Sequence, residues 1–152
     1  VANPVTMVFS NDNYYLVCYH DNHITLTNYR IDRMTEVGVL DTPINKDARP
    51  KGIDLCNYRK QVFSMFGGKS ERVTFEVASK LIDVIYDKFG EKVGITDLGN
   101  DKFKFTVDIQ ISDMFFGWCC SFGDKLKIIA PKEIKFQFSE YLNEIINNYI
   151  KE

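Results

Sequence analysis

Aromatic rings and guanidinium groups are concentrated between residues 14 and 33. The set comprises Tyr14, Tyr15, Tyr19, Tyr29, Arg30 and Arg33. Aromatic planes stack on nucleobases, and the planar guanidinium fork makes paired hydrogen bonds to phosphate oxygens. The cluster therefore indicates a site for a nucleotide or an oligonucleotide. A structural interpretation stays open beside it, because aromatic residues on strands usually pack in a core and a surface arginine usually pairs with a nearby carboxylate such as Asp32.

The net charge limits the size of such a site. The 152 residues include 19 basic and 21 acidic side chains, for a net charge of -2. Residues 1–70 hold 8 of the basic and 7 of the acidic side chains (net +1), and residues 71–152 hold 11 and 14 (net -3). Non-specific binding to nucleic acid rests on many lysine and arginine contacts to phosphate. Neither half supplies them, so a nucleic-acid site on this chain has to be compact.

Other chemistries lack their motifs. Gly67-Gly68-Lys69-Ser70 resembles part of a phosphate loop, but Phe63 stands where that loop needs a glycine, and a strand rather than a helix is expected after it. Neither a nucleophile with a recognisable base nor a pair of catalytic carboxylates is evident. We therefore predict that the chain is not an enzyme, and a small-molecule active site between two halves of the chain is left open as a further alternative.

Metal and redox chemistry are not expected either. His20 and His23 could chelate a metal, but no third ligand accompanies them. We predict neither a metal nor another cofactor. The cysteines form no Cys-x-x-Cys pair, and buried thiols in a reducing compartment are their expected state. They are Cys18, Cys56, Cys119 and Cys120.

The sequence shows no targeting pattern. It has no apolar run of about 20 residues and no signal peptide, so we expect a cytoplasmic protein without membrane contact. It begins at Val1 with no initiator Met, and we expect a processed or truncated piece of a longer protein.

Alternation with a period of two predicts three antiparallel strands in the first third of the chain. Val5, Met7 and Phe9 share one face, a turn follows at residues 11–13, and residues 14–20 resume the alternation. After a second turn at residues 21–22, a third strand is predicted over residues 24–33. Three strands make a small sheet, so we expect it to need support from the rest of the chain, another subunit or further strands.

The second half shows the order β-α-β-β-α-β-α. Strands are predicted at residues 71–77, 92–98, 102–112 and 125–129, and helices follow the predicted caps Ser79 and Asp113 and open at Pro131. The first six elements match the ferredoxin-like arrangement. The final helix carries an apolar stripe that must be covered, made of Ile134, Phe138, Tyr141, Leu142, Ile145, Ile146 and Tyr149.

A change of composition separates the two parts. Residues 41–50 are rich in proline and polar residues, and a short helix capped by Asp54 is predicted to follow and to stop at Gly67-Gly68. We predict three units: a β-domain at residues 1–45, a linker with a short helix at residues 46–70, and a second domain at residues 71–152.

Several segments, taken in order, resemble those of WYL-domain transcriptional regulators. Asn3-Pro4 followed by Tyr14-Tyr15-Leu16-Val17 resembles the segment that names the family, with Tyr14 in place of the Trp. Tyr29-Arg30-Ile31-Asp32-Arg33-Met34 resembles the family's arginine-containing strand. The strings that resemble the extension after the WYL domain are Phe63-Ser64-Met65-Phe66-Gly67-Gly68, Asp87-Lys88-Phe89-Gly90, Phe116-Gly117-Trp118 and Phe122-Gly123.

The resemblance implies an α+β fold: a small SH3/Sm-like β-barrel, truncated at its N-terminus, followed by a ferredoxin-like βαββαβ extension with an added C-terminal helix. It implies that the parent protein binds DNA through an N-terminal helix-turn-helix that this chain lacks. We expect an exposed or differently paired strand edge near Val5 to Phe9, closed in one arrangement by a second copy in a homodimer.

The resemblance also implies a sensor whose ligand is a nucleotide or a single-stranded nucleic acid. It assigns Arg30 and Arg33 as phosphate contacts, with Tyr15 and His20 as stacking or hydrogen-bonding partners. Arg30 and Arg33 fall on opposite faces of an ideal strand, so a shared pocket needs a bulge, a strand end or a barrel rim. Tyr14 and Leu16 are expected in the core. A constitutive oligomerisation module without a ligand is the alternative function.

Overall fold

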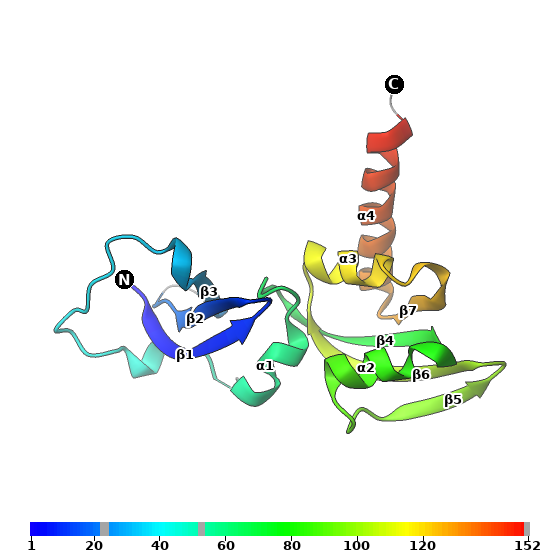
Figure 1. Cartoon of the computed structure of the whole chain (residues 1–152), viewed down its shortest axis with the longest axis horizontal. Coiled ribbons are helices and arrows are strands. Elements are labelled where there is room, and N and C mark those ends of the chain that lie inside the picture. The colour runs from blue at the N-terminus through cyan, green and yellow to red at the C-terminus, as the bar shows by residue number, and fades with distance from the viewer. Residues whose placement is uncertain (22–24, 52–53, 151–152) are drawn as a thin grey trace.

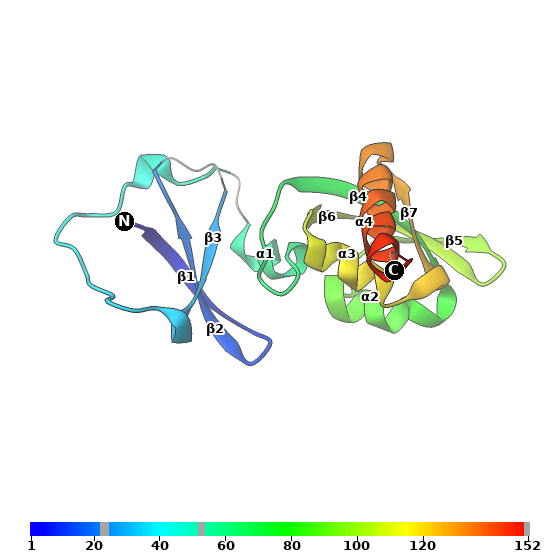
Figure 2. The same cartoon turned by 90° about the horizontal axis from the view of Figure 1, so that it is seen from above.

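The chain folds as an α+β protein with two antiparallel sheets and a long C-terminal helix (Figure 1). The computed structural model describes residues 1–21, 25–51 and 54–150. The predictions made for residues 22–24, including His23, lie outside the described residues. Helix α1 (Leu55–Gln61) lies between the two sheets in both views (Figures 1 and 2).

The first sheet is a three-stranded meander in the order β1-β2-β3. It is built from β1 (Asn3–Ser10), β2 (Asn13–Tyr19) and β3 (Thr27–Arg30). Asn11 and Asp12 turn the first hairpin with φ angles of 47° and 58°, the left-handed values of a two-residue turn that matches the sheet twist. Among the described residues β1 pairs only with β2, so the expected strand edge is present and the sheet is not a closed barrel.

The third strand is shorter than predicted. It ends at Arg30, and Ile31–Arg33 form a single 3-10 turn closed by a hydrogen bond from Met34 N to Ile31 O of 3.1 Å. The period of two in the sequence predicts a strand through this stretch, whereas in the structure a 3-10 turn follows Arg30 and the Asp32 side chain pairs with the Arg30 guanidinium.

Helix α1 covers the first sheet. Tyr58 of the helix packs with Val17, Tyr19 and Leu26. Val62 and Met65, which follow the helix, complete this small buried core. Asp54 Oδ1 accepts a hydrogen bond from the backbone N of Asn57, as predicted for a cap. The helix ends at Gln61, before the predicted stop, because Ser64 and Met65 have φ angles of 48° and 62°, which no right-handed helix contains.

The second sheet has the strand order β5-β6-β4-β7, with every pair antiparallel. Its strands are β4 (Ser70–Ala78), β5 (Ile95–Gly99), β6 (Lys102–Gln110) and β7 (Leu126–Ala130). Helix α2 (Ile82–Phe89) connects β4 with β5, and helix α3 (Asp113–Cys120) connects β6 with β7. The predicted order of elements is therefore present.

Two helix caps differ from the prediction. Ser112, not Asp113, caps α3, because its hydroxyl accepts the backbone N–H of Phe115 at 3.3 Å. Ser79 begins a 3-10 turn, Ser79–Leu81, and gives no side-chain cap to α2. In α3 the residue one position before the predicted cap reaches the free N–H groups, whereas α2 starts after the 3-10 turn without a side-chain cap.

The larger core lies against the second sheet. Phe75 and Phe105 stack across β4 and β6 with ring centroids 5.0 Å apart, and both are almost fully buried. Helix α3 adds Phe115, which contacts the Phe75 ring edge-on at 6.1 Å. Because these rings come from strands and a helix far apart in sequence, they fix the arrangement of the whole second half.

Helix α4 (Lys132–Ile150) packs through its first half and projects from the body at its end (Figure 1). Ile134 is buried and Phe138 and Tyr141 pack on the core, while Ile146 and Tyr149 are exposed. The predicted apolar stripe is therefore covered only in part by the described residues. No described helix is long and apolar enough to cross a membrane.

Candidate anion-binding site

The site is built where β3 ends. Arg30 is the last strand residue, and the 3-10 turn after it returns Asp32 to the same side chain. Arg30 Nε and Nη2 donate to the two carboxylate oxygens of Asp32, each at 2.8 Å. This bidentate pair raises the pKa of Arg30 and lowers the pKa of Asp32, in each case chiefly through the hydrogen bonds between them. Both groups therefore stay charged at neutral pH.

Tyr15 lies beside Arg30. The two residues are direct partners in the pairing of β2 with β3, so their side chains share one face of the sheet. Tyr15 also contributes to the raised pKa of Arg30, after the larger contribution of Asp32. The ring is half-buried against the first core. Tyr15 can thus support the Arg30 side chain while its edge remains open to a ligand.

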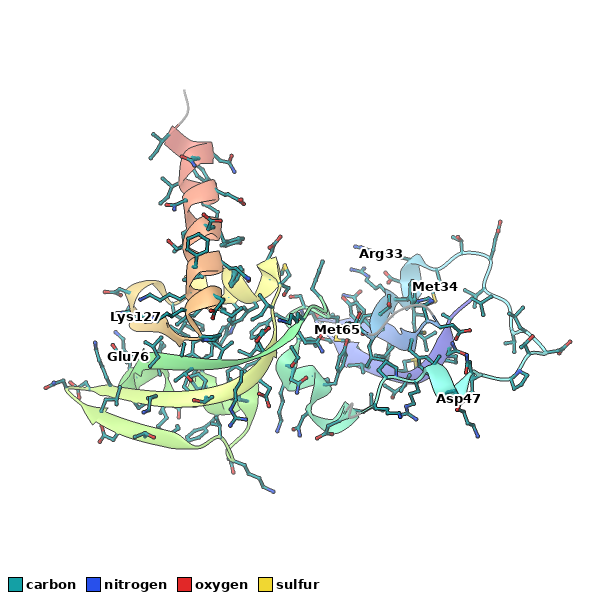
Figure 3. The ribbon with its side chains drawn as sticks, turned by 180° about the vertical axis from the view of Figure 1, so that it is seen from behind. Arg33, Met34, Asp47, Met65, Glu76 and Lys127 are labelled. Atoms are coloured by element: carbon teal, nitrogen blue, oxygen red, sulfur yellow. The ribbon has the colours of Figure 1, made fainter. Side chains whose placement is uncertain are left out.

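Arg33 lies at the surface on the 3-10 turn, next to Met34 (Figure 3). Its charge lowers the pKa of Asp32, after the larger effect of Arg30, whereas the hydrogen bonds to this carboxylate come from Arg30. Within the part of the chain that the structure describes, no ion pair involves Arg33. Because β3 ends at Arg30, Arg33 lies on the 3-10 turn and not on the opposite face of a continuing strand.

His20 lies apart from this group. Its Nε2 is 2.9 Å from the hydroxyl of Tyr29, and its Nδ1 is 3.0 Å from the carbonyl oxygen of Val1. Tyr29 precedes Arg30 on β3, so its side chain points to the opposite face of the sheet. The four predicted residues are therefore divided: Tyr15 lies beside Arg30, Arg33 lies on the turn that follows Arg30, and His20 contacts Tyr29 on the other face.

The arrangement can hold an oxyanion. Two guanidinium groups and one carboxylate leave one net positive charge. A guanidinium has five N–H donors, and Asp32 uses two of those on Arg30. The remaining donors, together with those of Arg33, suit phosphate oxygens. The Arg30–Asp32 ion pair also fits the structural interpretation of the sequence, in which a surface arginine pairs with a nearby carboxylate.

The opposite face of the first sheet is more exposed than predicted. Tyr14, expected in the core, is 55% exposed and packs on Phe9 with ring centroids 4.9 Å apart. Met7, on the same face, is also exposed. The motif that names the family could not show this, because exposure depends on what covers the sheet.

Other candidate chemistries find no support among the described residues. No group of three or more His, Cys, Asp or Glu side chains there could hold a metal. Cys18 and Cys119 are buried free thiols, and burial raises the pKa of each, so both stay protonated. The side chain of Cys56 lies outside the description.

One cavity of about 550 Å³ lies on the second sheet. Its lining combines charged residues with an apolar floor and includes no cysteine, serine or histidine. The lining residues are Lys69, Glu71, Ile111, Pro131, Glu133, Ile134 and Gln137. Of its charged residues, Lys69 and Glu71 form an ion pair at 2.6 Å.

Comparison with known proteins defines the class of the first sheet. Residues 1–39, which contain all four predicted site residues, match the WYL domain. The resemblance found in the sequence is thereby confirmed for this part of the chain. No curated protein matches the chain.

Among solved structures, the chain is similar to the proteasome accessory factor B/C (PafBC) of Arthrobacter aurescens. The two share 14% sequence identity with a TM-score of 0.46. The match covers 99% of this chain and 22% of PafBC, so this chain spans about a fifth of the length of that protein.

Proposed function

We propose that this chain is the effector-sensing and dimerisation portion of a helix-turn-helix transcriptional regulator, and that its ligand is a nucleotide or a single-stranded nucleic acid. One observation carries the proposal: the Arg30–Asp32 pair and the exposed Arg33 lie close together in the chain at the end of β3, inside the residues that match the WYL domain. The ligand's phosphate contacts Arg30 and Arg33, and Tyr15 lies beside it. His20 contributes only from the other face.

The proposed architecture is a partial SH3/Sm-like barrel at residues 1–45, a linker at residues 46–70 and a ferredoxin-like extension at residues 71–152. Two separate buried clusters support this division, one on each sheet. The strand order β5-β6-β4-β7, with helices after the first and third of these strands in sequence, supports the ferredoxin-like assignment.

The proposed mechanism is linkage. A ligand that binds one arrangement of barrel and extension better than another shifts the geometry of a homodimer, and thereby the spacing of the DNA-binding domains of the parent protein. The chain performs no catalysis in this mechanism and acts in the cytoplasm. Only a difference in affinity between the two arrangements can produce the shift.

The salt dependence of binding tests the proposal. We expect a fluorescently labelled single-stranded oligonucleotide to bind saturably, with the logarithm of the affinity falling against that of the salt concentration with a slope of about -1.4, since each of two phosphate contacts on a single strand contributes roughly -0.7. Fluorescence anisotropy from low to physiological salt measures this slope. Absence of saturable binding at the lowest salt, for the oligonucleotide and for a labelled nucleotide, would refute the proposal.

A constitutive oligomerisation module is the second candidate. The bidentate Arg30–Asp32 pair favours it, because that arginine already has a partner. Sedimentation analysis distinguishes the two candidates: a stable dimer in a chain that binds no anionic ligand supports the module.

A further inference from the structure

Residues 59–65 pass between the two halves and contribute to both cores. Val62 and Met65 of this stretch, and Tyr58 just before it, pack against the first sheet. Phe63, within the same stretch, points the other way, and its ring lies 5.0 Å from that of Trp118 in the second core. Figure 3 shows Met65 at the junction of the two halves. A short stretch of chain is thus shared by two hydrophobic clusters.

Asn28 of the first sheet forms hydrogen bonds with this stretch and with Tyr58. The Nδ2 atom of Asn28 donates to the hydroxyl of Tyr58 at 2.9 Å and to the carbonyl oxygen of Met65 at 2.7 Å. Asn28 lies two residues before Arg30 on β3, so both side chains share one face of that strand. Asn11, in the first hairpin turn, adds a hydrogen bond to the Ser64 hydroxyl at 3.3 Å.

Lys88 of helix α2 contacts the same stretch from the other side. Its ammonium donates to the carbonyl oxygens of Val62 at 2.7 Å and Arg59 at 3.3 Å. It also lies 4.1 Å from the centre of the Phe63 ring, in the geometry of a cation–π contact. These carbonyls are at the C-terminal end of α1, where a cation is favoured.

We propose that residues 59–65 form a clamp segment, held by Asn28 from the first sheet and by Lys88 from the extension, which transmits a displacement of β3 to the extension. Ser64 and Met65 hold left-handed backbone angles that cost free energy in residues other than glycine, and such angles persist where the surroundings determine them. The role of this segment in ligand sensing rests on the proposed function, whereas the contacts of Asn28 and Lys88 with the segment do not depend on it.

The pKa of Lys88 depends on how far the clamp segment buries its ammonium group. Burial and, as the smaller cause, repulsion by Arg59 together lower its pKa to about 8. On the side of the second core, Phe63 has the uncharged neighbours Phe115 and Trp118, and Lys60, from α1, approaches Gly90. An exposed lysine has a pKa of about 10.4, so loosening the segment takes up a proton between these values and is favoured as the pH falls from about 10 to about 8.

The test is an NMR titration of Lys88 in the whole chain without ligand, followed through the side-chain carbon next to the amine. In the wild type we expect a midpoint near 8. Asn28→Ala removes the grip of the first sheet, and we expect the pKa of Lys88 to rise by about one unit or more toward its ordinary value. Asn57→Ala, on the exposed side of α1, is the matched control and should leave the midpoint unchanged.

Two results would overturn the clamp. One is the same Lys88 midpoint in the wild type and in Asn28→Ala, and the other is a wild-type midpoint near that of an exposed lysine. Asn28→Ser carries the same prediction if Asn28→Ala does not fold. Because no ligand is used, failure of the clamp leaves the anion-binding site untested by this experiment, and failure of oligonucleotide binding leaves the clamp result intact.

Discussion

Arg30→Ala is expected to weaken oligonucleotide binding at least about tenfold. A hydrogen bond to a charged group contributes about 1.5–3 kcal/mol, and about 1.4 kcal/mol corresponds to a factor of ten in affinity. Arg30→Lys should recover only part of the loss, because an ammonium keeps the charge but not the planar fork. Fluorescence anisotropy at fixed low salt measures all three affinities.

A matched control separates the site from the general charge of the protein. Arg72, on β4, is an exposed arginine that also faces an aspartate, at 3.9 Å from Asp108. Arg72→Ala changes the net charge by the same amount and should leave the affinity within about twofold, an effect below 0.5 kcal/mol. Equal losses in Arg30→Ala and Arg72→Ala would show that binding depends on charge alone and would remove Arg30 from the site.

Gly68→Ala is expected to lower the free energy of unfolding by about 1–3 kcal/mol, the usual cost of overpacking. A Cβ atom at this position would lie 1.9 Å from the carbonyl oxygen of Ile111, so backbone would have to move. The N–H of Gly68 also donates to Gln110 Oε1 at 3.1 Å, which ties this stretch to the end of β6. Urea unfolding followed by circular dichroism measures the change.

Gly94→Ala is the control for this substitution. A Cβ atom there would meet nothing within 4 Å, so its effect on stability should be small. If Gly68→Ala proved as stable as the wild type, the close approach of residue 68 to β6 would be wrong. The sequence presents Gly67 and Gly68 only as a connector, and the need for glycine comes from the backbone of Ile111, which follows β6 directly.

Local patterns were sufficient to predict most elements of the second half. Phe103 and Phe105 alternate with polar residues along β6, and this alternation alone predicts a strand with one buried face. The glycine at position 90 ends α2 with a φ of 88°, a value that few other residues adopt. Such signals lie within a few residues of the element that they define.

The differences from the sequence predictions arise from contacts between distant or competing groups. The third strand stops at Arg30, and Asp32 on the turn that follows pairs with the Arg30 guanidinium; strand periodicity reveals neither feature. His20 was grouped with the arginines, but its hydrogen bond to Tyr29 lies on the opposite face. The sequence gives no role to Asn28, and it presents Lys88 only within the string Asp87-Lys88-Phe89-Gly90; the importance of both residues lies in the partners that the fold brings to them.

The site itself was only partly visible in the sequence. Residue types identified Tyr15, Arg30 and Arg33 as suited to an anionic ligand, and the structure places Tyr15 beside Arg30 and Arg33 on the turn that follows it. The sequence left a bulge, a strand end and a barrel rim open as ways to a shared pocket, and in the structure β3 ends at Arg30. Choosing among them required the backbone.

Side-chain NMR of the arginines tests the central claim most directly. The Nε–Hε signals of Arg30 and Arg33 are recorded while a single-stranded oligonucleotide is added to the whole chain. The account predicts that these two signals and the ring signals of Tyr15 shift together and saturate, while those of Arg72 stay in place. Shifts confined to the extension, or none at all, would contradict it.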